Sequence, residues 1–259
     1  MVKRNELIKF IYQTIGKSLL AKALKVDEVA NGVQILGKEQ VSKIALGTSL
    51  NEEFLKEAVK RGADFCIFHH GFDPRTFKSR FSLSAQKRLK LIFKNDLTIA
   101  GFHFCLDAHP QIGNNATIIK RLGAKITGQF WGEGWGFIAK FAEPQSLTAL
   151  KNKCAKIFNH EISSFLVNSK PVRTIAVVSG GAKPNAEDIA VMEEQGVELF
   201  ISGEPTESAP HKLLESGINY FIGGHYNTEV FGVQELGKRI KSRFGDKVKV
   251  EFIDIPNQV

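Results

Sequence analysis

An alternation of short apolar runs with amphipathic stretches limits what most of this chain can fold into. From Val41 the order is VSKIALGTS, then NEEFLKEAVKRG, then ADFCIFHHG. The two apolar runs predict buried strands, and the stretch between them predicts a helix capped by Ser49 or Asn51 and closed by Gly62. Strand, helix and strand in this order need a crossover connection, which is right-handed and joins parallel strands. We therefore predict an α/β fold with mainly parallel sheets.

The same order of elements occurs a second time. VRTIAVVSG at Val172 matches VSKIALGTS at Val41, and NAEDIAVMEEQGVELFISGEP at Asn185 matches NEEFLKEAVKRGADFCIFHHG at Asn51, 131 and 134 residues later. An internal duplication explains the match, and so does the general likeness of β-α-β units. We predict two similar α/β units, residues 1–125 and 126–259, with the last helix and strand packing back on the first unit. Open α/β sheets bind ligands at the carboxyl ends of their strands, so we expect the site in a cleft between the units.

Two stretches do not follow the alternation. The apolar positions from Leu7 to Ala23 step by three or four, which predicts an amphipathic helix. Residues 129–144 (QFWGEGWGFIAKFAEP), with many Gly and aromatic residues, predict a hairpin. Trp131 and Trp135 in it either stack on a flat ligand or pack under a Gly-rich turn.

The apolar content and the cysteines limit the compartment. No run approaches the roughly 18 apolar residues of a membrane-spanning helix, and polar residues interrupt the N-terminal segment where a signal peptide would be apolar. The 3 cysteines form neither an even disulfide framework nor a C-x-x-C motif. These observations predict a cytoplasmic protein with no membrane partner.

Polar, ionisable residues follow three of the apolar runs. In FCIFHHG, the adjacent His69 and His70 would point to opposite faces of a regular strand. Both serve one site only if the strand ends there and Gly71 lets the backbone turn. A pair of histidines that leaves a core strand is also found without a metal, so this motif alone decides nothing.

The second and third motifs add carboxylates. In GFHFCLDAHP, His103 and Asp107 share a face if the strand continues, although an Asp before a Gly-Asn-Asn turn is also ordinary turn or cap chemistry. In GGHYNTE, His225 follows two glycines, Thr228 is a natural N-cap, and Glu229 falls in the first turn of a helix. Glu229 either complements the helix dipole or joins His225 at one point.

Together the three motifs favour a metal site. Imidazole nitrogens and carboxylate oxygens at strand ends are ligands typical of Zn, Mn, Fe, Co or Ni. Five or six such ligands exceed what one tetrahedral ion needs. Two divalent metal ions bridged by a carboxylate would use the whole set.

The chain also resembles a known family. His69-His70-Gly71, His103-x-x-x-Asp107 with the following AHPQIGNN, the SGE segment at Ser202, GGHYNTE at Gly223 and the early Asn31-Gly32-Val33-Gln34 turn are similar to motifs of the NIF-three-like dinuclear metal centre family, whose bacterial members are called GTP cyclohydrolase 1 type 2 homologues. The resemblance covers nearly the whole chain. It differs at Gly71, where many relatives have Pro, and at His109, which only some relatives have.

The resemblance implies a ligand set and an assembly. It assigns two divalent metal ions to His69, His70, Asp107, His225 and Glu229, and gives His103 a secondary role near them. His109 is either a further ligand or proton donor, or a surface turn residue, and His160 and His211 match no motif. Relatives form ring-shaped hexamers, so a homohexamer is expected.

Two functions remain open. The first is a metal-dependent hydrolase of a nucleotide or another phosphorylated small molecule, with GTP as the named candidate and no identified catalytic residue. His103, His109 and Glu204, in that order, are candidates for its general acid or base. The alternative is a metal-binding regulatory or interaction protein without catalysis.

The net charge of +8 suits a phosphorylated ligand but does not require one. The N-terminus of the helix near Thr228 could hold a phosphate. No helix-turn-helix, zinc finger or basic stripe is present, so nucleic acid is not an expected partner. The Lys and Arg residues within 75–90 and 238–243 are better explained as solvated helix faces.

Overall fold

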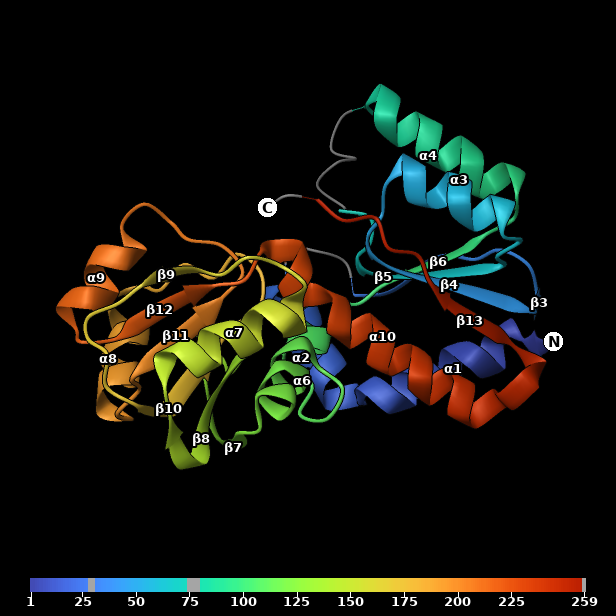
Figure 1. The fold of residues 1–259 in the computed structure, drawn as a ribbon. Helices are drawn as coiled ribbons and strands as arrows, with labels where there is room; N and C mark the ends of the chain where they lie inside the picture. The colour runs from blue at the N-terminus through green and yellow to red at the C-terminus, as the bar shows by residue number, and fades with distance from the viewer. Residues whose placement is uncertain (28–30, 74–79, 258–259) are drawn as a thin grey trace. The chain divides into compact units, whose positions relative to one another are not determined.

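The structure is a computed structural model that describes residues 1–27, 31–73 and 80–257. By its contacts the chain divides into two compact units. The first comprises Met1–Leu106 and Gly232–Ile255, and the second comprises Asp107–Phe231 and Pro256–Val259. Each unit contains one large sheet with helices, so the protein has a mixed α/β fold (Figure 1). The boundary at residues 125 and 126 rests on a repeated sequence pattern and stays a prediction.

The first unit is built on a five-stranded sheet in the order β13-β4-β5-β6-β2. Its strands are β2 (Gly32–Ile35), β4 (Lys43–Ser49), β5 (Phe65–His70), β6 (Thr98–Gly101) and β13 (Lys249–Phe252). The neighbours β13, β4, β5 and β6 are parallel, and β2 joins β6 antiparallel. The C-terminal strand β13 thus pairs with the first strand of the central pattern. A separate two-stranded sheet pairs β1 (Val2–Lys3) with β3 (Gln40–Val41).

Helices cover both faces of this sheet. The helices wholly within this unit are α1 (Arg4–Ile15), α2 (Lys17–Val26), α3 (Glu52–Lys60) and α4 (Leu83–Lys94), with a short 3-10 turn at Gly245–Lys247, while α5 (Phe104–Asp107) and α10 (His225–Phe244) each have residues in both units. Helices α3 and α4 lie over one face, where Phe54 and Ile92 join a buried cluster with strand residues such as Phe68 (Figure 1). On the other face α10 packs so closely that a Cβ at Gly237 would lie 2.3 Å from Leu46. The sheet is therefore buried on both sides, as its apolar strands require.

The second unit has a six-stranded sheet in the order β7-β8-β10-β11-β12-β9. Its strands are β7 (Lys125–Phe130), β8 (Gly136–Gln145), β9 (Ser163–Phe165), β10 (Val172–Val177), β11 (Leu199–Ser202) and β12 (Asn219–Ile222). Only β10, β11 and β12 are mutually parallel, and the other strands join antiparallel. The expectation of a mainly parallel sheet holds in the first unit and fails here, because the hairpin of β7 and β8 adds antiparallel strands at one edge.

Two apolar clusters lie on the two faces of the six-stranded sheet. One includes α6 (Asn114–Leu122) and α7 (Leu147–Phe158), and the other includes α8 (Ala186–Glu194) and α9 (Ala209–Glu215). The order β10-α8-β11-α9-β12 repeats the order β4-α3-β5-α4-β6 of the first unit. The two predicted copies of the pattern are therefore present as the parallel centres of the two sheets.

Several local expectations can be compared with the structure. Asn51, not Ser49, caps α3, because its side chain accepts a hydrogen bond from the N–H of Phe54 at 2.7 Å. The predicted N-terminal helix is broken in two at Gly16, whose φ of 90° lies outside helical geometry. Trp131 stacks on Phe200 with an interplanar angle of 13°.

The remaining comparisons concern composition. None of the helices among the described residues is long and apolar enough to cross a membrane. All three cysteines are buried thiols outside any disulfide, as the lack of an even disulfide framework predicts. The first part of the basic 75–90 stretch lies outside the described residues.

Candidate metal site

The adjacent histidines lie where β5 ends. His70 is the last residue of the strand, and His69 is fully buried while His70 is half-buried. Their ring centroids are 4.6 Å apart, so the two imidazoles lie side by side instead of facing opposite sides of the sheet. The expectation that the strand ends at this point is confirmed.

A glutamine from β2 fixes the turn that follows. The amide of Gln34 donates to the carbonyl of Phe72 and accepts from its N–H, at 2.8 and 2.9 Å. A Cβ at Gly71 would lie 2.2 Å from Oε1 of Gln34 and 3.0 Å from Cα of Gly101. A side chain at position 71 would therefore collide with the side chain of Gln34 and the backbone of Gly101, which explains the glycine there.

His103 joins the pair from the next strand. The strand β6 ends at Gly101, and the chain then turns into α5. The His103 ring lies 5.0 Å from that of His69 and 5.1 Å from that of His70. The idea that His103 and Asp107 share the face of a continuing strand is wrong, because the strand has already ended before His103.

The fold holds Nδ1 of each of these three rings. Nδ1 of His69 lies 3.0 Å from the carbonyl of Phe102, Nδ1 of His70 lies 3.0 Å from the hydroxyl of Ser49, and Nδ1 of His103 lies 2.9 Å from the carboxylate of Asp27. A carbonyl only accepts, so the His69 ring must donate from Nδ1 and keeps the lone pair on Nε2. A partner behind the ring that fixes tautomer and orientation is the usual arrangement for histidines that bind metals.

The third motif has a different local structure from the one expected. Helix α10 begins at His225, so Thr228 lies inside its first turn. The hydroxyl of Thr228 donates to the carbonyls of Gly224 and His225, which is bonding within a helix and not an N-cap. The left-handed φ of 86° at Gly224 lets the backbone leave β12 and begin the helix three residues earlier than expected.

A loop after β10 approaches the carboxylates of the second unit. The hydroxyl of Ser179 donates to Oδ1 of Asp107 at 2.7 Å, and Nδ2 of Asn114 donates to the same oxygen at 2.9 Å. At Gly180, where φ is 66°, a Cβ would lie 1.9 Å from Oε1 of Glu229. The SGG sequence thus lets one loop hold Asp107 and pass closely beside Glu229, which are both buried.

His225 lies between two carboxylates. Its Nε2 is 3.1 Å from Oε2 of Glu229, and its Nδ1 is hydrogen-bonded to Oε1 of Glu204. Burial lowers the pKa of the His225 imidazole, but the hydrogen bonds and charges of Glu229 and Glu204 outweigh burial and raise the pKa to about 9. The SGE segment therefore supplies the carboxylate that orients His225, a role the sequence left open.

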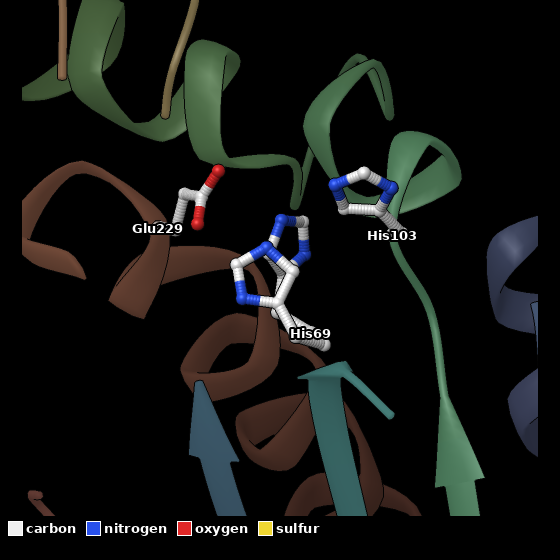
Figure 2. A group of neighbouring side chains, drawn as sticks. His69, His103 and Glu229 are labelled. Atoms are coloured by element: carbon white, nitrogen blue, oxygen red, sulfur yellow. The ribbon is translucent and has the colours of Figure 1, made fainter. Parts of the chain in front are cut away.

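Four side chains form a group that could hold a metal ion. One ligand atom from each of His69, His70, His103 and Glu229 lies within 4.8 Å of the others (Figure 2). Three imidazoles and a carboxylate are a donor set that suits a borderline divalent ion, so the chemistry of the residues fits a metal. His103 stands in this group alongside three of the expected ligands. Asp107 and His225 are placed by the Ser179–Gly181 loop and by Glu204.

The other histidines have local roles. Nδ1 of His109 accepts from the N–H groups of Gln111 and Ile112, so its ring stabilises the turn before α6. His160 is half-buried and its Nδ1 lies 2.6 Å from the carbonyl of Glu161. His211 is exposed on α9.

Several partners of these side chains are not marked by any motif. Asp27 reaches His103 over a separation of 76 residues, and Ser179 reaches Asp107 over 72. The only usable signal was the pair of glycines after Ser179, because consecutive glycines at a strand end allow close approach of a backbone to a site.

Known proteins share these motifs and this fold. The family model Duf34/NIF3 (NGG1p interacting factor 3) matches residues 2–258. The chain belongs to this family. A GTP cyclohydrolase 1 type 2 homolog of Archaeoglobus fulgidus is 34% identical over 233 residues, which cover 88% of this chain and 90% of the relative. One of Haemophilus influenzae is 30% identical over 255 residues, which cover 95% and 96%.

Solved structures resemble this NIF3-family chain over its full length. A structure described as protein ybgI, of unknown function, has a TM-score of 0.87 and 29% identity, and the match covers 100% of both chains. The expected family membership is therefore confirmed.

Proposed function

We propose that this protein holds two divalent metal ions on His69, His70, Asp107, His225 and Glu229, and that it hydrolyses a nucleotide or another phosphorylated small molecule. The observation that carries the proposal is the donor set itself. His69, His70, His103 and Glu229 each offer a ligand atom within 4.8 Å of the others. Asp107 and His225 add a carboxylate and an imidazole that donor or acceptor groups already orient.

The number of ligands supports two ions rather than one. A structural zinc site is usually closed with four protein ligands, whereas five ligands shared by two ions leave positions for water or substrate. When bound, such ions supply a deprotonated water near neutral pH and polarise an oxygen of the substrate. The ligand atoms are nitrogen and oxygen, so Zn, Fe, Mn, Co and Ni all remain suitable.

The residues around the set divide the other tasks. His109 is engaged in its turn and Glu204 is engaged with His225, so His103 is the remaining candidate to carry a proton at Nε2. The side chain of His103 is 16% exposed and that of His225 is 30% exposed, while Glu229 is 3% exposed. Partial access of solvent to the imidazoles favours catalysis over a purely structural or regulatory metal, which would be enclosed.

The substrate class rests on charge and on relatives. The net charge of +8 favours an anionic ligand. The relatives named as GTP cyclohydrolase 1 type 2 homologs make GTP the first nucleotide to test. The amino end of α10, at His225, carries the positive end of a helix dipole and is a suitable place for a phosphate.

The test combines metal analysis with a hydrolysis panel. The purified protein is loaded with each metal in turn and offered GTP, other nucleotides and phosphoesters, with His69→Ala as the inactive variant and His211→Ala as its matched control. We expect turnover by the wild type and His211→Ala and none by His69→Ala. Wild-type turnover no greater than that of His69→Ala with every substrate would contradict the hydrolase and leave the non-catalytic alternative.

We also propose a cytoplasmic homohexamer, as the family resemblance implies. Light scattering of the purified protein tests the assembly. A particle of about six chains is expected, and a stable monomer would contradict it.

A further inference from the structure

A buried aspartate lies directly behind the imidazole of His103. The side chain of Asp27 is 1% exposed, against 16% for His103. Its Oδ1 and Oδ2 lie 2.9 and 3.1 Å from Nδ1 of His103. None of the sequence motifs contains Asp27, which directly follows the last residue of α2.

The surrounding hydrogen bonds decide which atom carries the proton. The backbone N–H of His103 donates to Oδ1 of Asn31 at 2.9 Å, and a backbone N–H is always a donor, so the orientation of the Asn31 amide is fixed. Nδ2 of Asn31 then donates to Oδ2 of Asp27 at 2.8 Å, and the N–H of Phe104 donates to the same oxygen at 3.1 Å. Both of these donors reach Oδ2, while Oδ1 faces Nδ1 of His103, and a carboxylate can only accept hydrogen bonds. The ring of His103 must therefore donate from Nδ1.

The geometry determines which nitrogen of His103 is offered to the site. With the proton on Nδ1, the lone pair is on Nε2. The rings of His69 and His70 lie 5.0 and 5.1 Å from that of His103. His69 has the same arrangement, but its acceptor is the neutral carbonyl of Phe102. A carboxylate behind an imidazole holds the ring more firmly, because hydrogen bonds to charged groups are about twice as strong as neutral ones.

We propose that Asp27 is a positioning residue that holds His103 in its Nδ1-protonated tautomer, so that Nε2 is the nitrogen presented to the metal site and its substrate. The tautomer of His103 is inferred from the hydrogen-bond network, and its role at the metal site rests on the proposed function. Asp27 touches neither substrate nor metal and acts through His103.

Replacement of Asp27 by asparagine is expected to change the tautomer of His103. The single oxygen of the new amide must take the place of Oδ2, because the N–H groups of Asn31 and Phe104 both need an acceptor there. The amide nitrogen then faces Nδ1 of His103 and donates to it. Nδ1 becomes an acceptor and the ring proton moves to Nε2, which is the wrong tautomer for a nitrogen that must accept a proton or bind a metal.

The experiment reads the tautomer directly. Protein labelled with nitrogen-15 in its histidines is studied without metal at about pH 8.5, well above the ordinary histidine pKa of about 6.5. Long-range proton–nitrogen correlations distinguish the two tautomers, and His103→Gln identifies the His103 signals. We expect the Nδ1–H form in the wild type and a majority of the Nε2–H form in Asp27→Asn.

The matched control is Asp64→Asn, since Asp64 is also a buried carboxylate of the first unit that accepts from backbone and side chains. We expect it to leave His103 in the Nδ1–H form. A wild-type protein with His103 in the Nε2–H form would overturn the proposal, even if Asp27→Asn does not fold. So would a folded Asp27→Asn protein, with unchanged His211 signals, that keeps the Nδ1–H form.

The tautomer measurement and the hydrolysis assay test the two proposals independently. A tautomer change in Asp27→Asn, in a protein that hydrolyses nothing, supports the positioning role and removes only the hydrolase. An active hydrolase whose His103 tautomer ignores Asp27 keeps the reaction and removes the positioning role.

Discussion

The imidazoles of the first unit and the Asp107 carboxylate of the second unit are held in opposite ways. At the end of the five-stranded sheet, imidazoles are held from behind by acceptors, such as the carbonyl of Phe102 for His69 and the carboxylate of Asp27 for His103. In the second unit, Asp107 is held by donors, the hydroxyl of Ser179 and the amide of Asn114. These imidazoles therefore present nitrogen lone pairs, whereas Asp107 presents negative charge.

The difference concerns what an imidazole and a carboxylate each contribute to an ion. Neutral imidazoles supply coordination bonds but leave the charge of a divalent ion uncompensated. Carboxylates compensate that charge, and a buried charge is costly unless it is paired. If both contributions are needed, loss of an imidazole and loss of a carboxylate should both lower the affinity for metal strongly. Loss of a group that only donates a hydrogen bond to a carboxylate should lower the affinity by less.

The largest effect is expected from a buried imidazole. His69→Ala removes a ligand from a position that is fully buried. Metal affinity should fall by more than the ~10–100-fold typical of a lost supporting group. Metal analysis after dialysis against a buffered metal solution measures it, and His211→Ala should keep the wild-type content. Full metal retention by His69→Ala would show that His69 is not a metal ligand.

The contribution of a carboxylate is tested by removing the charge of Glu229 without changing the shape of its side chain. Glu229→Gln keeps an oxygen near the imidazoles and loses the negative charge, so affinity should fall by about 100-fold, at the upper end of that range. Glu235→Gln, on the same helix and paired with Lys238 at the surface, is the control and should bind metal normally. Equal affinities of the two variants would mean that charge compensation is not the contribution of Glu229.

A smaller effect is expected from the donor behind Asp107. Ser179→Ala removes one of the two hydrogen bonds to Oδ1 and leaves that of Asn114, so affinity should fall by about 10-fold. Ser146→Ala removes a hydroxyl that caps α7 in the same unit, which lowers stability but should not change metal binding. If titrations with the two variants agree, Asp107 needs no support from Ser179.

The smallest effect on metal is expected at the opposite end of the five-stranded sheet. Asp64 accepts from Ser42, Lys43 and Lys38 just before β5. Burial raises the pKa of its carboxyl, but these hydrogen bonds outweigh burial and lower the pKa below 3.8. The stability it adds is therefore present above about pH 4 and is lost as the pH falls through the lowered value.

Asp64→Asn should consequently leave metal binding unchanged while the free energy of unfolding falls by about 2 kcal/mol at pH 7. Urea unfolding at pH 7 and at about pH 3 measures both sides of the transition. The difference between wild type and variant should shrink at the lower pH. A difference that is the same at both pH values would show that the charge of Asp64 contributes nothing.

Local sequence patterns were sufficient to predict one part of the site. His69 and His70 end a strand whose apolar run is plain in the sequence, and the alternation places other strand ends at the same edge of a sheet. The hairpin and the parallel centres of both sheets follow from the same short-range signals. The antiparallel pairing of β8 with β10 and of β9 with β12 does not follow from them, because it depends on contacts between segments far apart in the chain.

The groups behind the ligands could not be predicted. Asp27, Ser179 and Glu204 act through hydrogen bonds to residues 76, 72 and 21 positions away, and the sequence does not show which side chain each of them holds. The start of α10 was misplaced because Thr228 has the chemistry of a cap, and only the backbone conformation at Gly224 shows that the helix has already begun.

The two glycines after Ser179 look alike in the sequence and are not interchangeable. A methyl group at Gly180 would collide with the Glu229 carboxylate, and φ there is left-handed. A methyl group at Gly181 would lie 3.5 Å from Glu204 and 3.6 Å from His225, which are ordinary contacts. Position 180 therefore requires glycine, whereas position 181 can accept a side chain that lines the space beside His225. Side chains of increasing size at 181 would change the space beside His225 one methyl group at a time while every ligand stays in place.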